Sequence, residues 1–155
     1  MRSIWKNPIH FIAFGFGSGA IPFAPGTWGT IAALPIYFLI QDFSLSLYLT
    51  LLLLATGFGI WICDVTEKDL GVPDHSGIVW DEIVGYLCTM ILAPKGWGWI
   101  LLGFILFRIF DILKPWPISW VERHVKGGLG IMVDDILAAV PAWIILQMLA
   151  WIILF

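Results

Sequence analysis

The sequence predicts an all-α, membrane-embedded helical bundle of about five to six helices. Of its 155 residues, 60% are hydrophobic and only 12% are charged, and the mean hydropathy is +0.94. Soluble domains usually carry about twice that charged fraction. Ten Trp and eleven Phe add aromatic bulk of the kind found at bilayer interfaces. The length suits one domain, so residues 1–155 are interpreted as a single membrane domain.

The composition also argues against several functional classes. The two cysteines, Cys63 and Cys88, lie in apolar runs without a CxxC pattern, which favours neither a disulfide nor a zinc site. The basic residues form no run and the net charge is −3, so no nucleic-acid partner is expected. The N-terminus shows no cleavable signal, because prolines and glycines interrupt its apolar stretch.

The first half of the chain predicts one interfacial segment and two helices. Residues 1–25 are rich in Gly and Pro, which favours a broken, interfacial segment. A helix is expected over 27–40, with Thr27 as its N-cap. Residues 45–63 carry no charge and span about 28 Å as a helix, close to a hydrocarbon core. Residues 64–76 are polar, and Gly71 and Pro73 mark a loop within them.

The second half predicts three longer helices and a short one. Residues 78–92 form the third helix and residues 97–112 the fourth, which prolines at 115 and 117 end. A short surface helix is expected over 119–125. The glycine-rich residues 127–130 predict a flexible joint before the last helix, over 132–155, with Pro141 as a kink.

Pairs of carboxylates stand at the ends of these apolar segments. Asp81 and Glu82 precede an uncharged run, Asp134 and Asp135 open the last hydrophobic segment, and Asp111 closes the one before. Isolated ionised carboxylates are costly to bury and need a partner, a metal or a proton. A solvated helix start would explain one such acid, but less well two repeated pairs.

We therefore expect these acids to converge on a divalent cation. Asp81, Glu82, Asp134 and Asp135 are the expected metal ligands, with Asp111 as a fifth candidate. Hard oxygen ligands favour Mg²⁺ over zinc. Such a cation would polarise phosphoryl oxygens and lower the pKa of a bound water.

Basic residues and glycines near these acids are candidate phosphate partners. Arg108 could recognise a phosphoryl group, although an ion pair with Asp111 explains it equally well. Lys114 could do the same, although interfacial anchoring is the commoner role of such a lysine. Backbone N–H groups at Gly26 and Thr27, and at Gly128 and Gly130, could cradle an anion. For Gly26 and Thr27 we favour a helix cap, and for His75 in its polar loop a solvated side chain over a catalytic one.

The charges also predict an orientation. With the N-terminus inside and alternating helices, all basic residues except Lys95 fall on the cytoplasmic side, which obeys the positive-inside rule with one exception. All acids except Asp42 fall on that same side. Topology does not explain this acid excess, which therefore points to function.

Four motifs resemble the phosphatidylglycerophosphatase A family, in the expected order and over nearly the whole chain. They are residues 15–19 with 25–29, 74–85, 107–118 and 127–135. The resemblance implies a mostly helical, Mg²⁺-dependent enzyme of the bacterial inner membrane, multi-pass, with its site on the cytoplasmic side. Its substrate would be the phospholipid phosphatidylglycerophosphate, which loses its terminal phosphate to give phosphatidylglycerol. Two departures are Ala139, where many members have glycine, and His75, where other branches have proline, which puts a universal role for His75 in doubt.

The catalytic residues expected on this reading are Asp81, Glu82, Asp111, Asp134 and Asp135. An aspartyl-phosphate intermediate and direct attack by water both stay open. One alternative function is an ion- or proton-coupled transporter, whose acids should lie at mid-membrane rather than at one end of every helix. Another is a non-catalytic membrane subunit whose acids bind a basic patch on a partner.

Overall fold

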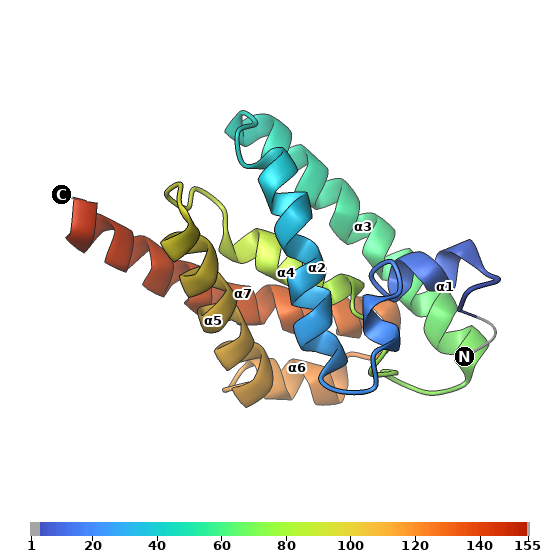
Figure 1. Ribbon diagram of the computed structural model, residues 1–155. Helices are drawn as coiled ribbons and strands as arrows, with labels where there is room; N and C mark the ends of the chain where they lie inside the picture. Colours follow the sequence, from blue (N-terminus) through green and yellow to red (C-terminus); the bar gives the residue numbers. More distant parts are fainter. Residues whose placement is uncertain (1–3, 155) are drawn as a thin grey trace.

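The computed structural model describes residues 4–154 as a bundle of helices (Figure 1). Within that range it contains no β-strand, so the all-α prediction is confirmed. The elements are α1 (Pro8–Ala13), the 3₁₀ helix η1 (Ser18–Ala20), α2 (Pro25–Ile40), α3 (Leu45–Leu70), α4 (Trp80–Thr89), α5 (Trp97–Leu113), α6 (Ile118–His124) and α7 (Gly127–Leu154). The described residues form seven α-helices, one more than the upper end of the expected five to six, because the N-terminal segment contains the short helix α1.

Helix α4 is the centre of the bundle. It contacts α2, α3, α5 and α7, and most of its side chains are buried. The helix is shorter than the expected segment 78–92. Its 10 residues extend about 15 Å, roughly half of a hydrocarbon core. Helix α4 therefore carries Asp81 and Glu82 into the packed interior of the bundle and is too short to cross a membrane by itself.

Helices α3 and α7 are the two elements that are long and apolar enough to cross a membrane. They contain 26 and 28 residues, and only 17% and 28% of their most apolar windows are buried. A core helix of a soluble protein would be mostly buried. On these helices large apolar side chains face outward instead, including Leu53 (73% exposed) and Trp151 (69% exposed). Such exposed surfaces fit contact with lipid.

Helix α3 extends beyond the predicted apolar segment 45–63, and the loop predicted at Gly71 and Pro73 follows its end. The helix continues through its polar end to Leu70. Lys68 pairs with Asp64 at i, i+4, with 2.6 Å between Nζ and Oδ2. Gly71 then ends the helix at φ 66°, and its N–H donates to the carbonyl oxygens of Glu67 and Lys68. This left-handed position suits glycine.

Two helix starts also differ from the prediction. Helix α2 begins at Pro25, and its N-cap is Ala24, so the expected cap at Thr27 is wrong. Proline fits this place because the first helical turn needs no N–H bond. Helix α7 begins at Gly127, so the expected flexible joint is the first turn of a helix that continues through Pro141.

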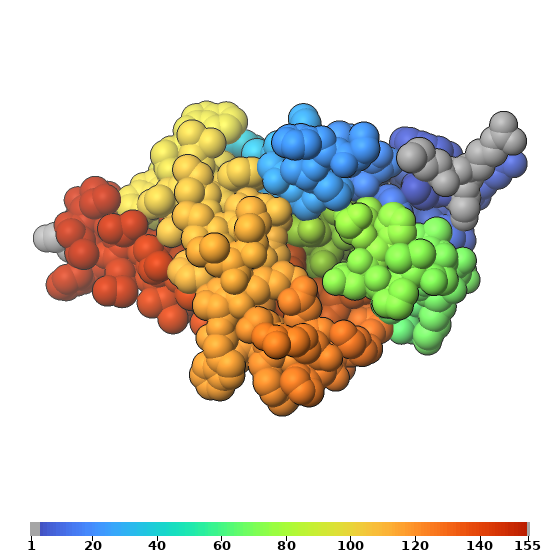
Figure 2. Space-filling model, turned by 90° about the horizontal axis from the view of Figure 1, so that it is seen from below, coloured from blue at the N-terminus to red at the C-terminus, as the bar shows by residue number. Residues whose placement is uncertain are grey.

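The two ends of the bundle differ in charge. An ion pair joins Lys95 to Asp42, which confirms that the two residues set apart by the orientation rule share one end. At the other end, the start of α2, the α3–α4 connection and α6 meet in one face (Figure 2). The membrane side of each end stays a prediction. Arg2, which the orientation rule counted, and Phe155, the expected end of the last helix, lie outside the described residues.

Candidate active site

Three carboxylates from two helices form a buried group. Asp81 and Glu82 lie in the first turn of α4, and Asp135 lies on α7. One oxygen from each lies within 4.8 Å of the other two. Asp81 is 8% exposed and Asp135 3% exposed. We call these three residues the acid cluster.

Each carboxylate of the acid cluster keeps an oxygen without a hydrogen-bond partner. These buried atoms are Oδ1 of Asp81, Oε2 of Glu82 and Oδ2 of Asp135. A buried oxygen without a partner costs free energy, and native structures contain few of them. Since a cation would bind such oxygens, the geometry and chemistry of the cluster fit a hard divalent ion.

The electrostatics of the cluster point the same way. Burial raises the pKa of Asp81 well above its usual range, and the charges of Glu82 and Asp135 raise it further. Burial also raises the pKa of Glu82, although a hydrogen bond from Asp81 and the charge of Arg108 oppose this shift. Close carboxylates in a dry site need a shared proton or a cation. The cluster is therefore unstable as three bare charges.

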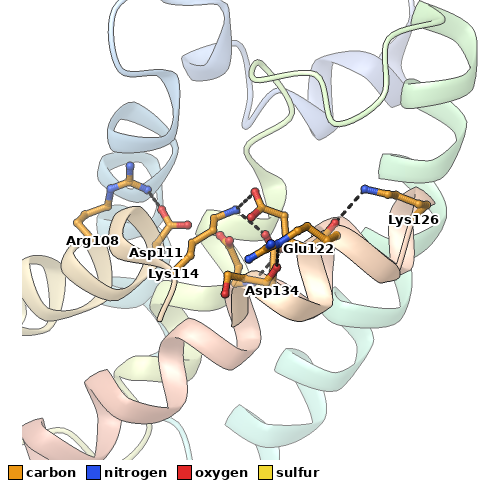
Figure 3. A network of polar contacts seen from close by, with 9 residues as sticks. Arg108, Asp111, Lys114, Glu122, Lys126 and Asp134 are labelled. Atoms are coloured by element: carbon orange, nitrogen blue, oxygen red, sulfur yellow. Dashed lines mark hydrogen bonds and ion pairs between the residues drawn. The ribbon is translucent and has the colours of Figure 1, made fainter. Parts of the chain in front are cut away.

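The structure separates Asp134 from the acid cluster. Its Oδ2 lies 2.7 Å from Nζ of Lys114, and the same Nζ lies 2.8 Å from Oε1 of Glu122 (Figure 3). Neighbours on a helix project about 100° apart, so Asp135 faces the cluster while Asp134 faces Lys114. A metal-ligand role for Asp134 stays a prediction.

Lys114 is held as a cation by these two acids. Burial lowers its pKa, but hydrogen bonds to Asp134 and Glu122 outweigh that effect and leave the pKa above its usual value. Sequence reasoning did not select Glu122. It stands in a short helix with no apolar run around it, and only the fold of α6 against α7 brings it to the site.

Arg108 pairs with Asp111 at i, i+3, so the ion-pair interpretation is confirmed. Both side chains are mostly buried, with 14% and 10% exposed. The pair does not use all the donors of the guanidinium, because Nε of Arg108 is buried without a hydrogen-bond partner. Asp111 also lies close enough to Asp135 for their charges to interact. Arg108 therefore keeps a donor for an anion.

The backbone of α2 touches the site at Gly26. A Cβ at this position would lie 2.4 Å from Oε1 of Glu82 and 3.1 Å from a guanidinium nitrogen of Arg108. Any side chain would displace these groups. The N–H of Thr27 donates to the carbonyl of Ala24 at 3.0 Å, inside the first turn. The structure places Gly26 in the site, and phosphate binding by both residues stays a prediction.

The other two glycines serve packing. A Cβ on Gly128 would lie 2.0 Å from the carbonyl oxygen of Ile60 on α3, and the Gly128 N–H points to a carboxylate oxygen of Asp64 at 3.4 Å. A Cβ on Gly130 would lie 2.2 Å from the carbonyl oxygen of Val125. Close backbone contact thus explains both glycines, and their role toward phosphate stays a prediction.

His75 is partly buried, and its contacts are local. Its Nδ1 accepts the N–H of Gly77 at 3.0 Å, and its ring packs against Phe14. These contacts shape the turn that leads into α4, and they differ from the solvated side chain that we expected.

A family model and two relatives with the same description match most of the chain. The family model described as phosphatidylglycerophosphatase A matches residues 11–150. A protein of that name from Escherichia coli K12 is 47% identical over 136 residues, which cover 87% of this chain and 79% of that protein. The Haemophilus influenzae protein of the same name is 45% identical over 141 residues, 90% of this chain and 86% of that protein.

A third relative carries another name. A Bacteroides thetaiotaomicron protein, to which its name provisionally gives phosphatidylinositol-3-phosphatase activity, is 41% identical over 151 residues, 92% of this chain and 93% of that protein. No solved structure matches the chain.

Proposed function

Because the chain belongs to the phosphatidylglycerophosphatase A family, we propose that it hydrolyses the terminal phosphomonoester of phosphatidylglycerophosphate to phosphatidylglycerol and phosphate. One observation carries the proposal beyond the family name. Three carboxylates, two buried and one half-buried, each with a buried unpartnered oxygen, lie beside an arginine with an unpartnered donor. This combination suits a cation and a phosphoryl group bound together.

Asp81, Glu82 and Asp135 would hold Mg²⁺. When bound, the ion would supply a Lewis acid that polarises the phosphoryl oxygens and offsets the charge that develops on them. The acids themselves position the ion at the start of α4, where the positive end of the helix dipole also favours anions.

Arg108 binds the phosphoryl group in this proposal. Its free Nε donates to a phosphoryl oxygen, while Asp111 fixes the guanidinium in place. Charge-assisted bonds of this kind are about twice as strong as neutral ones. Gly26 matters here because the absence of a side chain leaves Arg108 and Glu82 free to approach the same space.

Lys114 provides a second positive charge at the same site. Asp134 and Glu122 fix its ammonium group, so it is oriented before substrate arrives. Preorganised charge costs no rearrangement during the reaction, which is the main source of electrostatic catalysis. Asp134 and Glu122 are positioning residues in this scheme.

The names of the relatives share one substrate pattern. In phosphatidylglycerophosphate and in a phosphatidylinositol 3-phosphate, a phosphomonoester sits on a polyol that a phosphodiester joins to the lipid. We extend this pattern to the substrate of this chain, with glycerol as the polyol. The apolar surfaces of α3 and α7 support placement in a membrane, and we propose that the acid-rich end faces the cytoplasm.

An ion-coupled transporter is the alternative, and it is not favoured. Its acids should lie near the middle of long crossing helices. Here two of the three cluster acids begin a helix of 10 residues, and the basic residues beside them suit an anionic substrate.

The test is phosphate release from phosphatidylglycerophosphate by the purified protein in detergent. We expect turnover with Mg²⁺, none after exhaustive chelation, and recovery when Mg²⁺ is added back. No release under any metal condition would reject the substrate. Full turnover after chelation would reject the metal and leave the substrate standing.

A further inference from the structure

A polar cavity lies next to the contacts of Lys114 with Glu122 and Asp134, and the reaction described so far gives its other residues no role. Its volume is about 270 Å³. The walls come from the end of α3, the α3–α4 connection, α6 and the start of α7, which adjoin in Figure 2. The charged residues that line it are Glu67, Asp74, Glu122, Arg123, Lys126 and Asp134.

Two cations of this cavity lack an acidic partner. Lys68, Lys95, Arg108 and Lys114 all form ion pairs with carboxylates. In the described residues, Arg123 and Lys126 have only backbone partners. Arg123 Nε donates to the carbonyl of Ser119 at 2.9 Å, and Lys126 Nζ to that of Glu122 at 3.0 Å. These two exposed cations keep donors that an anionic group of a ligand can use.

Two of the four acids in the cavity, Glu67 and Asp74, also form no ion pair among the described residues. Asp134 and Glu122 are already paired with Lys114. Asp74 has no ion pair among the described residues, and only its backbone N–H is engaged, with Glu67 Oε1 at 2.9 Å. Its carboxylate is available to accept from hydroxyl groups. The cavity therefore offers donors for an anion and an acceptor for an alcohol.

The cavity and the acid cluster meet on α7. Asp135 belongs to the cluster and Asp134 lines the cavity. Six single bonds separate the two phosphorus atoms of a glycerophosphate headgroup, a reach of about 7 Å when extended. The cavity and the cluster thus adjoin at consecutive residues of α7, which suits a headgroup with two phosphates a few bonds apart. Figure 3 shows the same order along the site, from Arg108 through Lys114 to Lys126.

We propose that this cavity binds the phosphodiester and the polyol of the lipid headgroup while the terminal phosphate lies at the acid cluster. Arg123 and Lys126 recognise the diester, and Asp74 accepts from a polyol hydroxyl. The inference rests on the proposed function and deepens it. A lipid phosphate without a diester, such as phosphatidic acid, would leave the cavity unused.

The kinetic test uses Arg123→Gln, Lys126→Gln and the double variant in mixed micelles. With phosphatidylglycerophosphate, we expect KM to rise about 10-fold in the double variant and kcat to stay unchanged. The reason is that the diester is bound equally in the ground and transition states. Lys6→Gln is the matched control, since Lys6 is exposed and does not line this cavity. An unchanged KM in a double variant that melts like the parent would overturn the inference.

A binding test keeps the inference separate from the proposed reaction. Glycerophosphoglycerol, a soluble diester without a terminal phosphate, should raise the melting temperature of the parent and not of the double variant. Inorganic phosphate with Mg²⁺ should shift both proteins equally, because it uses the acid cluster. Equal shifts by the diester would overturn the inference. Neither result depends on turnover, so a failure of the proposed reaction would be recognised independently.

Discussion

At the scale of single residues, the acid cluster stores repulsion that a cation relieves. Asp81→Asn or Asp135→Asn removes one of the crowded charges and one ligand together. We expect either variant to lose turnover while the metal-free protein melts at the parent temperature or above it. The parent should gain about 2.7 kcal/mol when Mg²⁺ reaches a hundredfold excess over Kd, and the variants much less. Melting curves with and without Mg²⁺, beside phosphate release, measure both effects.

Asp42→Asn is the control for these variants, because Asp42 is exposed and pairs with Lys95 at the opposite end of the bundle. It should keep both turnover and the Mg²⁺ shift. An Asp81 or Asp135 variant with normal turnover and a lowered melting temperature would show an ordinary structural acid, and would remove that residue from the metal site.

Gly26 tests how tightly the phosphate partners are placed. In Gly26→Ala the new methyl group would lie 2.4 Å from Oε1 of Glu82, so Glu82 and Arg108 must move. Displacements of about 1 Å at a reacting centre can cost about 100-fold in rate. We expect kcat/KM to fall by about that factor, with the helical circular dichroism unchanged.

The matched control is Gly57→Ala, since a Cβ at Gly57 on α3 meets no atom within 4 Å. Alanine in a helix interior usually adds roughly 0.5–1 kcal/mol of stability over glycine. Full activity in Gly26→Ala would mean that the neighbours yield easily, and that this contact does not position the site.

The sequence predicts the convergence of Asp81, Glu82 and Asp135, because each pair stands at the edge of an apolar helix. It does not distinguish Asp135 from Asp134, since the two differ only in their rotation about α7, and neighbouring helices decide which faces inward. No local sequence pattern predicts that Glu122 belongs to the site. Its role depends on the contact with Lys114, which the packing of α6 creates.

At the scale of elements, the glycine-rich start of α7 is a packing surface. In Gly128→Ala the methyl group would lie 2.0 Å from the carbonyl oxygen of Ile60, so α7 must move away from α3. Overpacking typically costs about 1–3 kcal/mol. We expect a lower melting temperature for this variant.

Gly98→Ala in α5 is the control, because a Cβ there also meets no atom within 4 Å. A different result would support the anion cradle that the sequence suggested. In that case Gly128→Ala would keep the parent melting temperature and weaken the shift caused by inorganic phosphate.

Apolar runs predict α2, α5 and the start of α3 to within a few residues. They miss the polar end of α3 and the first turn of α7 for one reason. Both segments gain contacts outside their own apolar pattern: Asp64 pairs with Lys68 within α3, and its carboxylate also accepts the N–H of Gly128 at the start of α7. A polar stretch and a glycine run look like loops when each is read alone, and only their tertiary contact decides otherwise.

At the scale of the whole molecule, composition predicts a membrane-embedded helical bundle. The placement of charges predicts which residues share one end of that bundle. The apolar surfaces of α3 and α7 remain exposed, as expected for lipid contact. Lys95 and Asp42, the one base and the one acid that the orientation rule placed outside, form an ion pair at one end of the bundle. Composition does not reveal that α4 is too short to cross a membrane, because its flanking residues are equally apolar and end the helix only through turns.

Orientation is the remaining prediction at this scale, and single cysteines test it. In a background with Cys63→Ala and Cys88→Ala, Leu129→Cys lies on the first turn of α7 and Lys95→Cys at the opposite end, both at positions exposed to solvent or the interface. Basic residues favour the cytoplasmic side, so a membrane-impermeant thiol reagent should label Lys95→Cys in intact cells and Leu129→Cys only after the membrane is opened. The reverse labelling would place the acid cluster outside, opposite to the cytoplasmic side that we propose for it. That result would reject the proposed orientation and would not test the metal binding of the cluster.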